Sequence, residues 1–259
     1  MPQPHYEYRG MLASTWDLLR GETAGWPDRR FYRELIEEHG QPVLDVGCGT
    51  GRLLLDYLQE GIDIDGVDLS PEMLALCREK AERLGLTPTL FQQSMAALSL
   101  PRAYRTILVP SSSFQLLVNP ADAQEAMRCF YGHLQPGGAL AMPFMALWQE
   151  GEPVDTGWRA AGEATRPADG AIIRRWSRST FDTVNRLEHT WDRFETLRSG
   201  EVIAAEEHER SPATRWYTQD EALRLYEEAG LTRVRVYRGF TRAPASAEDR
   251  VFSVVGERP

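Results

Sequence analysis

Three glycines at alternate positions, directly after a short apolar segment, constrain the fold of this 259-residue chain more than any other feature. Residues 43–46 (VLDV) predict a buried parallel strand, and residues 52–58 after the glycines predict a helix. A strand, a glycine turn and a helix together form a ligand-binding arrangement. Glycines allow a ligand to approach the backbone closely, and the first amides of the helix can bind its polar atoms.

The spacing of Gly47, Gly49 and Gly51 narrows the choice of ligand. A dinucleotide site has the pattern G-x-G-x-x-G, whose third glycine would replace Arg52, and the chain contains no P-loop pattern. Asp45 adds a carboxylate at the end of the predicted strand, which favours a cationic ligand over a pyrophosphate. A sulfonium cofactor that carries an amino group fits this polarity better than NAD does.

The string DVGCGTG at residues 45–51 resembles motif I of the class I S-adenosylmethionine-dependent methyltransferases. Asp68 ends a second predicted strand about twenty residues after the glycine turn, where such folds bind the hydroxyls of a ribose. A carboxylate there can accept two hydrogen bonds from the vicinal diol. Residues 68–74 (DLSPEML) and 134–138 (LQPGG) also resemble family motifs. The resemblance is therefore close over residues 43–144 and looser over the rest of the chain.

The resemblance implies an α/β fold with a Rossmann-like, doubly wound sheet of seven mostly parallel strands, an N-terminal helical lid and an antiparallel β insertion after the fifth strand. Residues 1–40 are expected to form the helical cap, and residues 41–146 and 218–259 the S-adenosylmethionine-binding core. Residues 147–217 are expected to form the insertion. It holds five of the seven tryptophans, which indicates an added small core or a substrate cavity. Such an insertion is similar to those of small-molecule methyltransferases for amino sugars and glycine-type amines.

The resemblance also implies where the cofactor and the methyl acceptor bind. The predicted cofactor-binding residues are Asp45, Gly47, Cys48, Gly49, Gly51, Asp68, Leu69, Met73, Ser94, Met95, Pro110 and Ser111. The predicted substrate-binding residues are Trp16, Ser112, Phe114, Phe144, His208 and Trp216. Ser94 stands where the family often has an aspartate that contacts the adenine amino group, so its hydroxyl or a backbone group would take that role.

The predicted activity is methyl transfer from S-adenosylmethionine to a nitrogen or oxygen atom of a small molecule. This in-line displacement has a good leaving group, so positioning supplies much of the rate, and we assign no catalytic base. The three cysteines are scattered, and the acidic run at residues 206–209 (EEHE) alternates between the faces of a strand, so no metal site is expected. Two alternatives stay open: a protein or RNA methyltransferase, and a non-catalytic regulatory protein that binds S-adenosylmethionine.

Charge and composition narrow the expected partners. The net charge of −9 disfavours a nucleic-acid substrate, and no apolar run of about twenty residues predicts a membrane span. The N-terminus lacks the apolar segment of a secretion signal, and three unpaired cysteines are typical of a cytoplasmic protein. We therefore expect a cytoplasmic enzyme with a small-molecule methyl acceptor. The insertion would serve as a substrate lid, a dimer contact or both, which leaves a homodimer as an open alternative.

Overall fold

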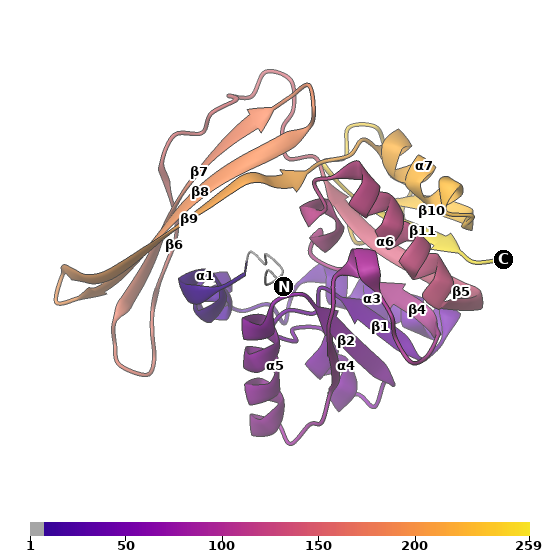
Figure 1. Ribbon diagram of the computed structural model, residues 1–259, viewed down its shortest axis with the longest axis horizontal. Helices are drawn as coiled ribbons and strands as arrows, with labels where there is room; N and C mark the ends of the chain where they lie inside the picture. The colour runs from indigo at the N-terminus through magenta and orange to yellow at the C-terminus, as the bar shows by residue number, and fades with distance from the viewer. Residues whose placement is uncertain (1–7) are drawn as a thin grey trace.

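The computed structural model describes residues 8–259, which form two separate β-sheets. The larger sheet has seven strands in the order β10-β11-β5-β4-β1-β2-β3 (Figure 1). These strands are β1 (Val43–Val46), β2 (Ile64–Asp68), β3 (Thr89–Gln92), β4 (Tyr104–Leu108), β5 (Leu134–Met145), β10 (Thr232–Arg238) and β11 (Val251–Glu257). Only β11 runs antiparallel to both of its neighbours, and the other pairs are parallel. The predicted seven-stranded, mostly parallel sheet is confirmed.

Helices cover both faces of this sheet. They are α3 (Pro27–His39), α4 (Leu54–Gln59), α5 (Pro71–Arg83), α6 (Pro120–His133) and α7 (Gln219–Glu228), with the short 3-10 helices η1 (Met95–Ala97) and η2 (Ser113–Leu116). One buried cluster packs α3, α4 and α5 against the sheet, and another packs α6 and α7. Neighbouring strand residues such as Val43 and Leu44 belong to different clusters, because successive side chains point to opposite faces.

Proline and capping side chains set where the helices begin. α3, α5 and α6 each have proline in the first turn, where its missing amide hydrogen costs nothing. The Ser70 hydroxyl accepts a hydrogen bond from the Met73 amide at 3.1 Å and so fixes the start of α5 at the tip of β2. Thr218 and Glu221 form a reciprocal capping box at α7. These caps hold the strand tips and helix starts that surround the site described below.

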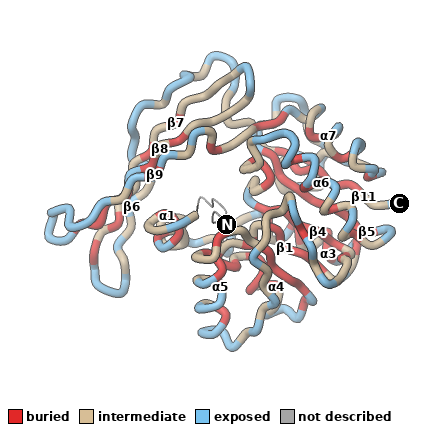
Figure 2. The backbone as a smooth tube through the Cα atoms, in the orientation of Figure 1, coloured by how far each residue is buried: buried red, intermediate tan, exposed pale blue. Residues whose placement is uncertain are grey.

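The second sheet is antiparallel and follows β5, so the predicted insertion is confirmed. Its strands are β6 (Arg159–Thr165), β7 (Ile172–Asp182), β8 (Leu187–Arg198) and β9 (Glu201–Arg215). It extends away from the core, and it is most exposed along β6 and the first five residues of β9 (Figures 1 and 2). The sequence of β6, RAAGEAT, shows little apolar alternation, since β6 is an edge strand that is mostly exposed.

Two short N-terminal helices, α1 (Gly10–Ser14) and α2 (Trp16–Arg20), lie between the core and the insertion (Figure 1). The Gly10 amide donates to Glu72 Oε2 of α5 at 2.7 Å, and the Met11 amide donates to Glu206 Oε2 of β9 at 2.9 Å. α1 therefore joins the two sheets. The sequence predicts a helix that begins after a cap at Ser14 or Thr15, and α2 begins at Trp16 with Thr15 at its N-cap position; α1, which ends before Thr15, was not predicted. Residues 1–7 of the predicted cap lie outside the described residues, and the lid role of residues 1–40 stays a prediction.

Candidate active site

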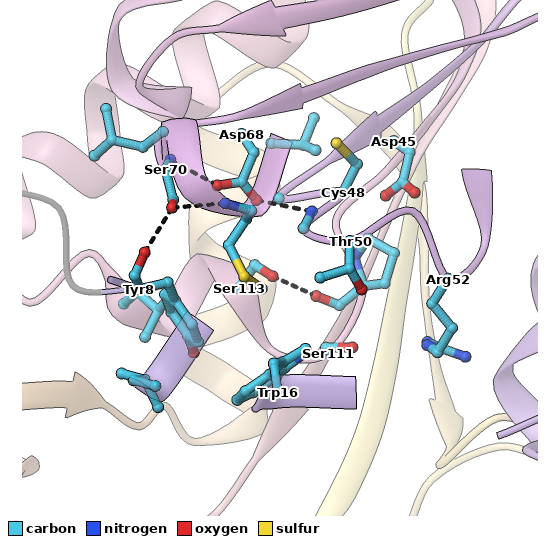
Figure 3. A pocket seen from close by; sticks show the side chains of 18 of the residues that line it. Tyr8, Trp16, Asp45, Cys48, Thr50, Arg52, Asp68, Ser70, Ser111 and Ser113 are labelled. Atoms are coloured by element: carbon cyan, nitrogen blue, oxygen red, sulfur yellow. Dashed lines mark hydrogen bonds between the residues drawn. The ribbon is translucent and has the colours of Figure 1, made fainter. Parts of the chain in front are cut away.

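A cavity of about 430 Å³ lies where the ends of β1, β2 and β4 meet α1, α2 and the insertion sheet. This volume lies within the range of roughly 300–1,000 Å³ that is typical of small-molecule sites. Eleven of the twelve predicted cofactor residues line the cavity, all except Gly51. Asp45 and Asp68 lie on the core side of it, and Trp16 lies across from them on the α2 side (Figure 3). The strand tips therefore converge on one enclosed site.

Close packing explains the glycines of the turn. A Cβ on Gly47 would lie 2.7 Å from Ser113 Oγ, and a Cβ on Gly51 would lie 2.6 Å from Cys77 Sγ. Both glycines also have positive φ values, +71° and +84°, which other residues rarely adopt. Gly51 thus lets the turn pack onto α5 rather than contact the cavity. Its predicted contact with the cofactor stays a prediction.

Asp68 ties the tip of β2 to the glycine turn. Its Oδ2 accepts a hydrogen bond from the Gly49 amide and its Oδ1 accepts one from the Ser70 amide, both at 2.8 Å (Figure 3). Burial raises the pKa of Asp68, and the amides of Ser70, Gly49 and Leu69 oppose the rise. The two carboxylate oxygens together have about four acceptor sites, so they can also accept from a ligand donor. A ribose diol in the cavity fits this arrangement.

Asp45 is the most deeply buried charged group of the cavity lining, with 2% of its surface exposed. Burial raises its pKa to about 7, although the nearby Arg52 guanidinium opposes that shift. Within the described part of the chain, its Oδ1 has no hydrogen-bond partner. A buried carboxylate oxygen without a donor fits a cationic ligand group, such as the ammonium of S-adenosylmethionine.

Arg20 of α2 was not predicted, because nothing in the sequence distinguishes it from an ordinary basic residue at a helix end. Its guanidinium lies 5.3 Å from the Trp16 ring centroid and 4.5 Å from that of Trp26, and it donates to Ser111 Oγ at 2.9 Å. Among residues 8–259 no carboxylate forms an ion pair with Arg20. Burial lowers its pKa, and the charge of Arg52 adds to that effect. This cation fits the carboxylate of S-adenosylmethionine.

The opposite end of the cavity is suited to an adenine ring. Leu69, Met73 and Met95 supply apolar lining there, beside Ser94. Ser94 Oγ accepts a hydrogen bond from the Ala96 amide at 3.2 Å, which caps η1. The hydroxyl hydrogen of Ser94 is therefore still available to a ligand acceptor.

Five of the six predicted substrate residues do not line the cavity; Trp16 is the exception. Phe114 and Phe144 are fully buried in the core, where their rings pack edge to face with centroids 6.0 Å apart. Trp216 is buried against Phe181 of β7. These aromatic rings stabilise the junction between the core and the insertion, and their contact with a substrate stays a prediction.

His208 and Ser112 lie near the cavity without lining it. His208 of β9 is buried, with Nε2 2.7 Å from Glu206 Oε1, and its ring packs edge-on against Phe194, which does line the cavity. Ser112 and its neighbour Ser111 both have left-handed φ values, 58° and 56°, which are uncommon outside glycine. Strained loop residues of this kind cluster at functional sites.

Sequence reasoning missed the part of the cavity wall that the insertion supplies. Ala161 of β6, Arg175 of β7 and Phe194 of β8 line the cavity. Their contribution depends on the register and tilt of the insertion sheet, which the alternation of residues along single strands does not define.

The described residues hold no metal-binding constellation and no membrane-spanning helix. No group of three or more His, Cys, Asp or Glu side chains in residues 8–259 is arranged to hold a metal ion. None of the helices in that range has both the length and the apolar character needed to cross a membrane.

Comparison with known proteins places this geometry among methyltransferases. A family model described as a methyltransferase domain matches residues 43–138. The dTDP-3-amino-3,6-dideoxy-alpha-D-glucopyranose N,N-dimethyltransferase of Streptomyces fradiae is 27% identical over 239 residues, 88% of this chain and 87% of that protein.

Two solved structures share the fold over most of the chain. An S-adenosylmethionine-dependent methyltransferase from Clostridium acetobutylicum ATCC 824 has a TM-score of 0.74 at 18% identity, and the match covers 92% of this chain and 94% of that one. An amino pentose methyltransferase from Micromonospora echinaspora, with S-adenosylmethionine bound, has a TM-score of 0.68 at 20% identity, covering 98% of this chain and 100% of the other.

Proposed function

We propose that this chain, which belongs to the class I S-adenosylmethionine-dependent methyltransferases, transfers a methyl group to a nitrogen atom of a polar small molecule. S-adenosylmethionine, when bound, supplies a methyl group activated by a positively charged sulfur. The residues of this chain would hold that cofactor by its three polar ends. Asp45 faces the ammonium, Arg20 the carboxylate and Asp68 the ribose diol.

The choice of nitrogen rests on one observation: the described lining of the cavity contains no histidine or lysine that could act as a base. Its two carboxylates, Asp45 and Asp68, are those that fit the cofactor. A neutral amine attacks through its own lone pair and can lose its proton afterwards, whereas a hydroxyl needs a base during the attack. Apart from the Tyr8 phenol the described lining offers no spare base, and it therefore suits an amine acceptor, which can attack without one.

The position of the cavity supports catalysis by positioning. Residues of α1 and α2 line it on one side and residues of the insertion sheet on another. Holding an amine in line with the methyl group supplies much of the rate of such a displacement. An amino sugar is the acceptor class that we favour, since the Streptomyces fradiae relative is named for one.

The test has a cofactor arm and an acceptor arm. Calorimetric titration with S-adenosylmethionine, S-adenosylhomocysteine and NAD should give micromolar binding of the two sulfur nucleosides and none of NAD. Formation of S-adenosylhomocysteine is then measured with three acceptors: dTDP-3-amino-3,6-dideoxyglucose, glycine and catechol. We expect turnover with an amine and none with catechol. Turnover with catechol alone would refute the nitrogen assignment.

A further inference from the structure

The insertion sheet brings a cationic side chain to the cavity wall. Arg175 of β7 lines the cavity beside Phe194. Both carboxylates of the described lining, Asp45 and Asp68, come instead from the core strands β1 and β2. The wall formed by the insertion therefore presents a positive charge and, within residues 8–259, no carboxylate of its own. The core half of the cavity fits the cofactor, so this wall faces the space left for the acceptor.

Arg175 is held in a fixed orientation. Its Nε and Nη2 lie 2.9 and 2.8 Å from Oδ1 of Asp192 on the neighbouring strand β8, and its Cζ lies 5.7 Å from the Phe194 ring centroid. Asp192 has no exposed surface. A buried carboxylate on one side and an aromatic ring on the other thus orient the guanidinium.

The same guanidinium keeps donors available for a ligand. It has five N–H groups, of which the contact with Asp192 occupies two. Among the residues that the structure describes, no other side chain accepts from Arg175. One quarter of the Arg175 side chain is exposed. The remaining donors form a planar fork that matches a carboxylate or a phosphate better than any neutral group.

Building on the proposed function, we propose that Arg175 binds an anionic group of the methyl acceptor, a carboxylate or a phosphate, and so selects which amines are methylated. A merely structural Arg175 would stabilise the insertion through Asp192 and leave ligand binding unchanged. The two roles differ in whether replacing Arg175 weakens the binding of anionic probes.

The test uses the full chain loaded with S-adenosylhomocysteine and calorimetric titration with two anionic probes. Thymidine diphosphate represents a nucleotide-linked acceptor and glycine an amino acid, and thymidine and glycinamide are their counterparts without the anionic group. We expect one anionic probe to bind, its counterpart to bind more weakly, and Arg175→Met to weaken the anionic probe roughly tenfold or more. Arg175→Lys should fall between, since it keeps the charge without the fork.

Arg174→Met is the matched control. Arg174 is the next residue on β7, on the opposite face of the strand, and its Nε pairs with Glu163 at 2.7 Å. This variant should bind the probes as the wild type does. Thermal melting and affinity for S-adenosylhomocysteine report whether each variant is folded. If Arg175→Met is not folded, the affinities of Arg175→Lys and the wild type for the anionic probes are compared instead.

Failure of both anionic probes to bind the wild type, or equal binding of an anionic probe by wild type and Arg175→Met, would overturn this assignment. The proposed function has a separate outcome. Methylation of an amine that carries a carboxylate or phosphate, at a rate unaffected by Arg175→Met, removes the anion subsite and leaves amine methylation standing. Arg175-dependent binding of an anionic probe, with no turnover of any amine, removes amine methylation and leaves the subsite.

Discussion

Replacing Asp45 with asparagine should stabilise the ligand-free protein at neutral and alkaline pH. The pKa of this buried carboxyl is about 7, whereas its unfolded value is near 3.8. Between these values the folded state binds the extra proton, so stability falls as pH rises through the window. A shift of about three pKa units corresponds to roughly 4 kcal/mol of lost stability once pH exceeds 7. Asparagine keeps the shape of aspartate and cannot ionise.

The assay is urea unfolding of the wild type and Asp45→Asn at pH 5 and pH 8. The asparagine variant should be more stable than the wild type by about 4 kcal/mol at pH 8. At pH 5 the difference should be less than half of that, because most of the pH range between the unfolded and folded pKa values of Asp45 lies above pH 5. The other titrating groups are common to both proteins, so the difference isolates position 45. A stability difference that is zero, or equal at both pH values, would refute the argument from burial.

As pH rises, the affinity of the wild type for the cofactor should increase while its stability decreases. The ionised Asp45 carboxylate is the form that attracts an ammonium group, so the wild-type affinity for S-adenosylhomocysteine should rise about tenfold between pH 6 and pH 7.5. Asp45→Asn should bind more weakly and lose this dependence. A variant that is both more stable and a weaker binder would show that the binding site costs stability.

Three further substitutions test other parts of the site. Asp68→Ala should weaken S-adenosylhomocysteine binding roughly 10- to 100-fold by calorimetry, because hydrogen bonds to a charged group are lost. Asp63→Ala, at an exposed position just before the same strand, should not weaken it. Gly51→Ala should destabilise the fold by more than about 1 kcal/mol in urea unfolding, since its Cβ would meet Cys77 Sγ, and an unchanged midpoint would contradict that packing. Arg52→Met should cost roughly 3–5 kcal/mol of stability by leaving Asp28, 3% exposed, without its ion-pair partner, and a loss below about 1 kcal/mol would count against it.

The core was predictable from sequence because each of its elements has a local signal. Residues 43–46 have the strand bounds that we predicted, and prolines mark the starts of three helices. The glycine turn also identified the cofactor end of the cavity, since close approach of backbone to ligand needs glycine wherever it occurs. In this region local sequence and tertiary structure agree.

The rest of the cavity was not predictable, because it depends on how distant elements meet. Arg20 and Arg175 line one cavity although they are far apart in the chain and neither belongs to a motif. Phe114 and Phe144 looked suitable for a substrate cavity by position, but tertiary packing placed both in the core. An aromatic residue near a strand end fits either place, and only the packed structure distinguishes them.

The two halves of the cavity have different chemistry, and this difference explains how such an enzyme can change its substrate. The core supplies the carboxylates that fit the cofactor, on the tips of β1 and β2, where parallel neighbours fix their positions. The insertion supplies the opposite wall through a separate sheet that shares no strand pairing with the core. Substitutions on the inner face of β7 or β8 can therefore alter the charge presented to the acceptor without disturbing the glycine turn. Charge reversal at position 175, as in Arg175→Glu, should consequently change acceptor preference and leave S-adenosylhomocysteine affinity within about threefold of the wild type, which parallel titrations of cofactor and probes would measure.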